Sequence, residues 1–210
     1  MTVKTYSVSK QGETKLSSNF KVKEFQCHDK SDKVLIDTDL VNLLQSIRSH
    51  FKKPVVITSA YRTAAYNASV GGSSGSLHVK GQAADIQIAG ISPVIVGMYA
   101  DSLGAGGVGL YAYGTYTGFN HIDTRSVKYR WLTITRSGSY QGISKILPII
   151  KQGGTKNTTN SVKLVQRRLG VSESGTFGGI TTDAVKQFQK YVGIKSDGIV
   201  GVNTWTKMFS

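Results

Sequence analysis

The sequence contains little cysteine, little proline and no long hydrophobic run. Cys27 is the single cysteine, and three prolines occur among 210 residues. One thiol excludes an intramolecular disulfide framework and any zinc site built from several cysteines. The apolar run from Val94 to Ala100 is far shorter than the roughly 18 residues of a membrane span. Residues 1–15 also lack the apolar segment of a secretory signal. We therefore expect no disulfide, no membrane association and no signal peptide.

Acidic residues are scarce as well. The chain has 12 Asp and Glu against 26 Lys and Arg, a formal net charge of +14. Such an excess favours an anionic partner: nucleic acid, an acidic membrane surface, or a bacterial wall rich in phosphate and carboxylate. The basic residues are spread along the chain, and no nucleic-acid-reading motif accompanies them. We therefore expect no nucleic acid as the partner, and the charge by itself does not select among the other anionic partners. We also expect a monomeric chain.

A polar stretch rich in glycine, threonine and asparagine, residues 151–160, divides the chain and predicts a linker. Residues 1–150 before it predict an α+β domain with a largely antiparallel sheet. The apolar spacing there predicts helices at 37–51 and 93–103, and strands at 54–58, 84–88, 108–113, 119–124 and 130–135. Residues 161–210 predict a small domain of three helices, at 162–169, 181–192 and 204–209.

Residues Gly104 to Gly109 satisfy the pattern G-x-G-x-x-G. A dinucleotide site requires this pattern to follow a strand and to open a helix. Here it follows a predicted helix and opens a predicted strand. We therefore interpret it as a turn into the sheet.

Two of the four histidines stand in a pattern that suggests chemistry. His28 and His50 lie among polar residues and are expected at the solvated surface, whereas Cys27 is expected to be buried. His78 precedes a glycine turn and then Asp85 on a strand, and His121 lies on another strand. Two histidines and one carboxylate form a zinc set that leaves a fourth position for water. Buried histidines satisfied by hydrogen bonds are the competing interpretation, and spacing alone favours them.

The pattern Ser-x-His-x-x-Gly-x-Ala-x-Asp at 76–85, followed by His-x-Asp at 121–123, resembles the zinc D-alanyl-D-alanine carboxypeptidase family. That family includes phage endolysins that cut the L-alanyl-D-glutamate bond. The resemblance covers roughly residues 18–135, through further blocks at 20–25, 58–67 and 107–111. It implies the fold of the lysostaphin, carboxypeptidase and hedgehog group, an antiparallel sheet with flanking helices. It also implies one Zn²⁺ per chain, bound by His78, Asp85 and His121.

The same resemblance implies a catalytic arginine and a substrate cleft. Arg62 would polarise the scissile carbonyl and bind its developing oxyanion. The residues that would line the cleft are Tyr61, Tyr66, Asn67 and Ser76. For the two tyrosines, plain packing is an equal alternative.

The chain departs from many relatives in its general base. They place a glutamate three residues before the last histidine, where this chain has Gly118. Asp123 shares a strand face with His121 and becomes the base by elimination. Two alternatives remain open: Asp123 supports a metal ligand instead, or Glu24 folds back from the N-terminal block.

Residues 161–209 resemble the three-helix peptidoglycan-binding domain. The matching positions are Gln166, Phe188-Gln189, Asp197-Gly198 and Thr204-Trp205. Apolar members of the pattern are expected in the core, so that exposed polar groups would contact the wall.

Together these observations predict a zinc peptidase that hydrolyses peptidoglycan stem peptides, delivered by a wall-binding domain. The bond would be that of an L-Ala-D-Glu endopeptidase or a D-Ala-D-Ala carboxypeptidase. The lack of a visible signal fits a phage endolysin held in the host cytoplasm before release, although an exported bacterial enzyme is an alternative. A second hypothesis is a wall-binding module that contains zinc but does not catalyse, and the missing glutamate favours it.

Overall fold

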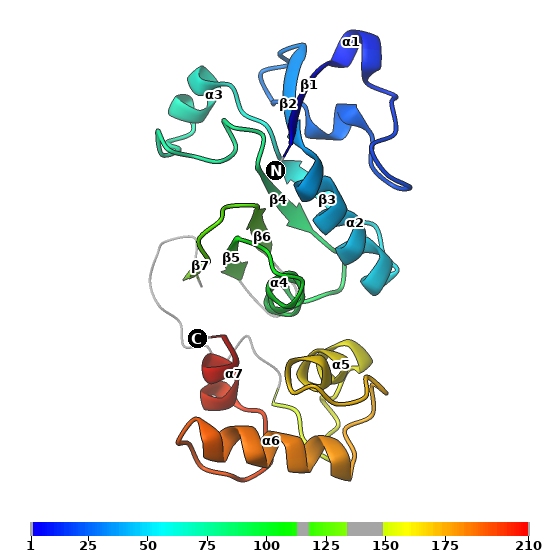
Figure 1. Ribbon diagram of the computed structural model, residues 1–210, viewed down its shortest axis with the longest axis vertical. Coiled ribbons are helices and arrows are strands. Elements are labelled where there is room, and N and C mark those ends of the chain that lie inside the picture. Colours follow the sequence, from blue (N-terminus) through cyan, green and yellow to red (C-terminus); the bar gives the residue numbers. More distant parts are fainter. Residues whose placement is uncertain (1, 113–117, 134–148, 210) are drawn as a thin grey trace.

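A computed structural model describes residues 2–112, 118–133 and 149–209. It confirms a mixed α+β domain with a mostly antiparallel sheet, followed by a small helical domain (Figure 1). The central sheet has five strands in the order β3-β4-β6-β5-β7. Its strands are β3 (Val56–Ser59), β4 (Ala83–Gln87), β5 (Gly107–Ala112), β6 (Gly118–Asp123) and β7 (Tyr129–Thr133). The pair β5–β7 is parallel, and the other neighbours are antiparallel.

An N-terminal layer lies beside this sheet. Strands β1 (Val3–Ser7) and β2 (Lys33–Asp37) form a separate antiparallel pair. The helical segments of this layer and of the sheet connections are α1 (Val8–Gln11), η1 (Val22–Phe25), α2 (Thr38–Phe51), α3 (Ala64–Ser69) and α4 (Pro93–Ser102). The carboxylate of Asp37 accepts the Asp39 amide and so begins α2, and Lys52 in the left-handed conformation ends it.

Helix α4 covers one face of the sheet and leaves the other face for the site. Gly97 allows this close approach, because an added Cβ would lie 2.0 Å from the Leu110 side chain. The side chains on this face of the sheet, among them Ile86 and Ile122, are fully buried. Because side chains alternate along a strand, Asp85 and His121 point to the opposite face. That alternation places the candidate chemistry on the face that α4 does not cover.

The C-terminal domain consists of α5 (Thr159–Arg168), α6 (Gly179–Tyr191) and α7 (Val202–Phe209) around the fully buried Trp205. Helix α5 begins at Thr159, earlier than its apolar spacing indicated, because the Thr158 hydroxyl caps it. Ile150 is buried and pairs with Val200. The segment predicted as a linker at 151–160 therefore ends in α5 and begins beside a residue packed into this domain. The limits 1–150 and 161–210 of the two domains stay predictions.

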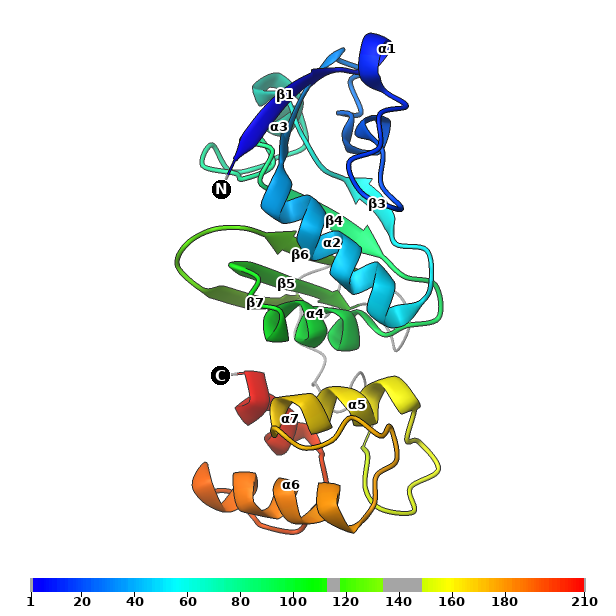
Figure 2. The same cartoon turned by 45° about the vertical axis from the view of Figure 1, so that its right-hand side comes forward.

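The two domains pack against each other through α4 and α5. Both views show α5 on the side of α4 away from the sheet (Figures 1 and 2). Every residue from Pro93 to Asp101 is buried, so α4 is covered all round. The Arg167 guanidinium lies 4.8 Å from the centre of the Tyr99 ring, and Arg168 pairs with Asp101 at 3.2 Å. The seam α4–α5, as we name this contact, makes the domains neighbours rather than independent modules.

His50 takes part in the same region. It was expected at the solvated surface, but it is half-buried and its ring stacks on Tyr99 at 3.8 Å between ring centres. The prediction was wrong because tertiary packing at the end of α2 covers a side chain whose sequence neighbours are polar. His28 is exposed and Cys27 is buried, as predicted.

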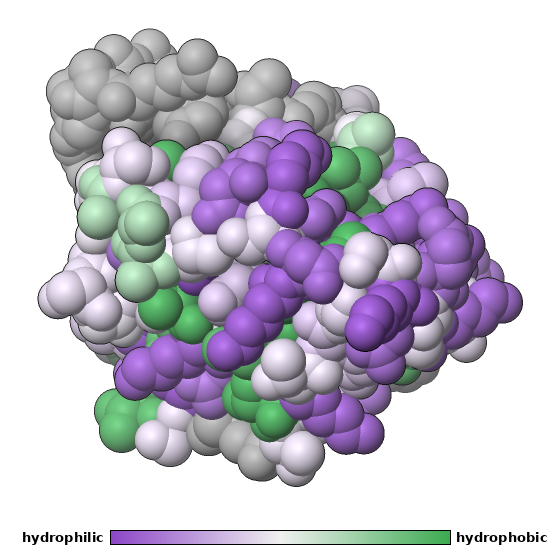
Figure 3. Space-filling model, turned by 90° about the horizontal axis from the view of Figure 1, so that it is seen from above, coloured by the Kyte–Doolittle hydropathy of each residue, from purple (hydrophilic) through white to green (hydrophobic). Residues whose placement is uncertain are grey.

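The rest of the surface agrees with the composition. Seen from the end that carries α1 and α3, the molecule is mostly hydrophilic, with scattered hydrophobic residues between (Figure 3). None of the helices in the described ranges has the length and hydrophobicity needed to cross a membrane.

Candidate active site

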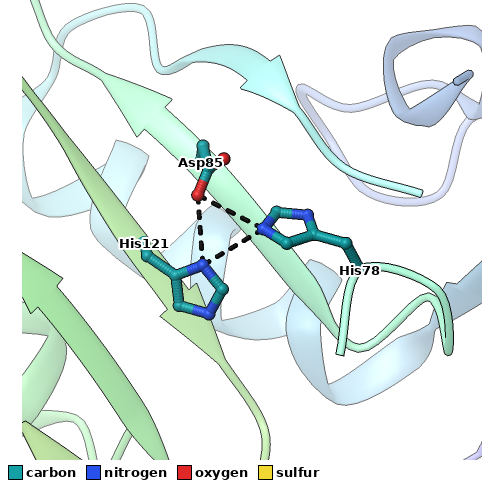
Figure 4. Close-up of side chains that lie close together, drawn as sticks. All are labelled: His78, Asp85 and His121. Atoms are coloured by element: carbon teal, nitrogen blue, oxygen red, sulfur yellow. Dashed lines mark hydrogen bonds and ion pairs between the residues drawn. The ribbon is translucent and has the colours of Figure 1, made fainter. Parts of the chain in front are cut away.

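His78, Asp85 and His121 converge on one point of the sheet face (Figure 4). Asp85 on β4 and His121 on β6 are direct cross-strand partners, and His78 reaches them from the turn before β4. His78 Nε2 lies 3.1 Å from His121 Nδ1 and 3.3 Å from Asp85 Oδ1. His121 Nδ1 lies 3.1 Å from the same carboxylate oxygen. The three residues that the sequence suggested as a set are therefore brought together.

The turn before β4 and a backbone carbonyl hold His78 in place. Gly81 has φ +69, and an added Cβ would lie 2.3 Å from the Leu35 carbonyl oxygen, so the turn requires glycine. His78 Nδ1 donates to the carbonyl of Ala60 at 2.7 Å. Because a carbonyl oxygen only accepts, this bond places the ring proton on Nδ1 and leaves the Nε2 lone pair facing the cluster.

The second histidine lies between two carboxylates. Asp123 lies two residues after His121 on the same strand face, and its Oδ2 is 3.1 Å from His121 Nε2. Asp85 Oδ1 lies at the same distance from the other ring nitrogen, Nδ1. A cation bound in the cluster would take the Nδ1 lone pair, and the ring proton would then be on Nε2 and be donated to Asp123. Gly107 opposite Asp123 makes room for this pair, because an added Cβ would lie 2.1 Å from the carboxylate.

The cluster consequently brings three atoms that can bind a metal close to one another. His78 Nε2, His121 Nδ1 and Asp85 Oδ1 stand 3.1–3.3 Å apart. Tetrahedral zinc with bonds of about 2.0–2.2 Å requires ligand atoms about 3.3–3.5 Å apart. The donor types and their spacing therefore fit a zinc-like cation.

The titration behaviour of the cluster has the same cause. Burial acts to raise the pKa of Asp85, but the imidazoles of His121 and His78 outweigh it and hold that pKa well below its usual range. Burial acts to lower the pKa of His121, and the carboxylates of Asp123 and Asp85 hold it above its usual value. The two carboxylates thus favour a positive charge at this point, which either a proton on His121 or a bound cation can supply.

Arg62 contacts the metal-type cluster through Asp85. Its Nη2 donates to Asp85 Oδ2 at 2.8 Å, and its Nε donates to the hydroxyl of Ser59 at 2.8 Å. The resemblance implied a contact with the scissile carbonyl, whereas the contact described here is with Oδ2 of Asp85. Arg62 therefore orients Asp85 so that Oδ1 faces the histidines.

Asp123 is deeply buried behind the His121 ring. Its side chain is 0% exposed, and Arg125 Nε donates to both of its oxygens at 2.9 Å. Burial acts to raise the pKa of Asp123, but His121 and Arg125 outweigh it and lower that pKa. Glu24, the other alternative for a base, is exposed and accepts the Lys21 amide at the start of η1. Neither carboxylate has the position expected of a general base in front of the cluster.

The residues expected to line a cleft differ in their surroundings. Asn67 is 3% exposed, and its Nδ2 donates to the carbonyl of Ser73 at 2.9 Å, so it braces a loop. Tyr61 is buried, and Tyr66 is half-buried and stacks on the exposed His28. The Ser76 hydroxyl accepts a hydrogen bond from the His78 amide and so helps to build the turn that carries His78. The structure brings Ser76 beside the cluster and uses Asn67 for packing.

An aromatic row beside the cluster was missed in the sequence. The centres of the Trp131 and His121 rings lie 5.0 Å apart, and Trp131 Nε1 donates to the Tyr111 hydroxyl at 3.0 Å. Tyr111 in turn stacks on Phe119 at 4.2 Å. Gly109 permits this arrangement, because an added Cβ would lie 2.4 Å from the Trp131 ring. The sequence signal that could have predicted this row is the alternation of aromatic residues along the last predicted strands.

Fold and site together define a class: an α+β domain with a two-histidine, one-carboxylate metal-type cluster, followed by a small helical domain. The chain belongs to the peptidase M15 family, which it matches over residues 18–123. Residues 158–208 match the family described as "Putative peptidoglycan binding domain".

A curated protein shares part of this sequence. The chain is 38% identical over 79 residues to "Probable peptidoglycan L,D-endopeptidase MepK" of Haemophilus influenzae. The match covers 35% of this chain and 41% of that protein. The chain therefore spans about two fifths of the length of this relative.

Proposed function

We propose that this protein is a zinc-dependent peptidase that hydrolyses peptide bonds in the stem peptides of bacterial peptidoglycan. The observation that carries the proposal is the convergence of three atoms that can bind a metal, from His78, Asp85 and His121, each residue with a second partner that holds its side chain. Membership of a peptidase family supports hydrolysis. The match at 158–208 and the name of the curated relative support peptidoglycan as the substrate.

The chain's own residues have distinct roles in this proposal. His78, Asp85 and His121 hold one zinc, and the zinc when bound supplies the Lewis-acid chemistry of amide hydrolysis. The Ala60 carbonyl and the Asp123 carboxylate keep the two imidazoles in the tautomers that ligation needs. Arg62 holds Asp85 and places a positive charge beside the cluster, where it can stabilise the charge that develops on a carbonyl oxygen.

We assign Asp123 the role of orienting His121 rather than that of general base. Its complete burial, its bonds from Arg125 and its place on the far side of the imidazole support this assignment. The prediction that Asp123 accepts a proton from water remains the alternative, and the two roles have different consequences that an Asp123→Asn variant separates.

The proposal extends to location and partner. The C-terminal domain would hold a monomeric enzyme on the wall, and the enzyme would be an endolysin that stays in the host cytoplasm until release. Within the stem peptide, the L-Ala-D-Glu and D-Ala-D-Ala bonds are the candidates. Tyr61 and Tyr66 remain candidate contacts for the substrate.

A lysis assay separates the enzyme from a non-catalytic zinc module. Purified walls incubated with the protein should lose turbidity, a chelator should stop the loss, and added zinc should restore it. A non-catalytic module would sediment with the walls and leave their turbidity and released amino groups unchanged. His78→Ala should also sediment with walls but release nothing.

A further inference from the structure

Two turns of the C-terminal domain are built in the same way. Gln166 in α5 and Gln189 in α6 are each 1% exposed, and each side-chain amide closes the turn that follows its helix. Gln166 Nε2 donates to Thr181 Oγ1 at 2.9 Å, and its Oε1 accepts the Gly175 amide at 2.9 Å.

The second turn repeats these contacts. Gln189 Nε2 donates to Thr204 Oγ1 at 3.0 Å, and its Oε1 accepts the Gly198 amide at 2.9 Å. Gly175 and Gly198 have φ values of +77 and +74. The chain therefore contains an internal repeat, and the pairs 166/189, 175/198 and 181/204 share one spacing.

The exposed side chains of the two turns differ, although the scaffolds agree. Lys195 of the second turn corresponds to Ser172 of the first, and Asn203 corresponds to Ile180. The first turn forms without a cation or an amide at these positions, so Lys195 and Asn203 are not needed to build the second. Lys195 is 87% exposed at its side chain and lies 3.9 Å from Asp197, too far for a hydrogen bond.

A cavity of about 220 Å³ adjoins the second turn. Its lining combines an apolar part with polar groups: Ile194, Ile199, Lys195, Asp197, Asn203 and Thr204. Sites for drug-sized ligands enclose about 300–1,000 Å³, so this space suits one sugar ring or one amino-acid residue. Lys195 and Asn203 supply donors, Asp197 and Asn203 supply acceptors, and the two isoleucines supply an apolar surface.

The geometry points to this cavity as the subsite for an N-acetylated amino sugar of the wall glycan. The acetamido group of such a sugar carries one N–H donor, one carbonyl acceptor and one methyl group. The N–H suits the acceptors Asp197 and Asn203, the carbonyl suits the donors Lys195 and Asn203, and the methyl suits Ile194 and Ile199. The inference rests on the proposed wall-binding role of this domain, and it names the part of the wall that is bound.

The test is an NMR titration of the full-length protein with a tetramer of β-1,4-linked N-acetylglucosamine, which carries no peptide. We expect shift changes concentrated at Ile194, Ile199 and Asn203. The double variant Lys195→Ser and Asn203→Ala should bind the tetramer at least 10-fold more weakly. The melting temperature of this double variant should be unchanged, because the first turn has serine, Ser172, at the position that corresponds to Lys195. Ser172→Ala is the matched control and should bind normally.

Three results would overturn the inference: unchanged affinity in the folded double variant, shift changes confined to other surfaces, or shift changes at the cavity caused by a stem peptide and not by the tetramer. Hydrolysis of a soluble stem peptide, measured in parallel, tests the peptidase itself. Loss of glycan binding with normal peptide hydrolysis would therefore be distinguishable from failure of the proposed function.

Discussion

Asp123 and His121 lie two residues apart on β6, with Asp123 Oδ2 3.1 Å from His121 Nε2. The same carboxylate is 0% exposed and is held by Arg125. In the proposed zinc-bound state, the carboxylate would accept a hydrogen bond from the Nε2 proton and so leave Nδ1 for the metal, while Arg125 holds the carboxylate in place. We therefore propose that Asp123 positions His121 instead of meeting the substrate.

Asp123→Asn tests this role against that of a general base. If Asp123 orients His121, zinc affinity should fall about 10–100-fold, and saturating zinc should restore most of the rate. If Asp123 is the base, the rate at saturating zinc should fall about 100-fold or more with zinc affinity unchanged. Competition with a chromophoric chelator measures the affinity, and release of amino groups from a soluble stem peptide measures the rate. Glu24→Gln, a change at an exposed carboxylate, serves as the control.

Trp131 should act on substrate binding. The centre of its ring lies 5.0 Å from that of His121, and an indole ring is not expected to bind the metal. Trp131→Ala should therefore raise KM for a soluble stem peptide several-fold, while zinc content stays at one per chain. Trp131→Phe keeps an aromatic surface and should recover most of the effect. Loss of zinc in Trp131→Ala, or an unchanged KM, would contradict a role in the substrate wall.

Removal of the C-terminal domain should destabilise the catalytic domain. A chain ending at Lys151 would expose the outer face of α4, whose residues Pro93 to Asp101 are all buried in the whole protein. Re-exposing one large apolar side chain costs about 1.5–3 kcal/mol, so the melting temperature should fall by about 3–10 °C.

The full-length variant Arg168→Ala is the control for this truncation. It removes a partly exposed ion pair with Asp101, which is worth about 0–1 kcal/mol, and should hardly change the melting temperature. A truncated chain as stable as the whole protein would show that α5 contributes nothing to α4.

The seam α4–α5 should weaken as the pH falls. Burial lowers the pKa of His50, the cations of Arg167 and Lys163 lower it further, and Glu173 opposes them. Because the pKa in the folded state lies below the unfolded value of about 6.5, the unfolded state binds more protons once the pH falls through this range. The free energy of unfolding should therefore decrease below about pH 6.5.

A variant isolates this contribution from other acid effects. His50→Phe keeps a ring against Tyr99 but cannot be protonated. The fall in melting temperature between pH 7.5 and pH 5.5 should be smaller in His50→Phe than in the parent protein. Equal falls in both proteins would mean that His50 does not couple the seam to pH.

The metal-type cluster was predicted through the family resemblance, because spacing alone favoured buried histidines satisfied by hydrogen bonds. The local causes visible in the sequence were the alternation around Asp85 and His121 and the glycine turn that brings His78 close to Asp85. The contacts of Arg125 and Trp131 depend on β7 pairing in parallel with β5, a register that no short pattern specifies. The sequence therefore left open whether Asp123 acts as the general base or orients His121.

The helices and strands also differ in how well the sequence predicts them. The helix predicted at 93–103, from its apolar run and its start at Ser92-Pro93, is present at Pro93–Ser102. Strand β1 and helix α3 were not predicted, because β1 is mostly exposed and α3 has only six residues, so neither shows a clear apolar period. The predicted strand at 130–135 is described from Tyr129 to Thr133, and its last two residues lie outside the described part, as does residue 113 of the strand predicted at 108–113.

The backbone at Gly118 gives a structural reason why this chain lacks the glutamate that many relatives have at this position. Its φ is +130, a backbone conformation that side chains rarely adopt, and its carbonyl accepts from Gln87 Nε2 at 2.8 Å. A glutamate at this position would require a different start to β6. Gly118→Glu should therefore lower the melting temperature without raising activity, and a gain in the rate of hydrolysis would contradict this explanation.

The most direct test of the account is metal analysis of the purified protein and of two histidine variants. The account predicts one zinc per chain in the parent protein, one in His28→Ala, whose histidine is exposed, and none in His78→Ala, whose Nε2 faces Asp85 and His121. Stoichiometric zinc in folded His78→Ala, or a parent protein that binds no zinc when the metal is supplied, would contradict it.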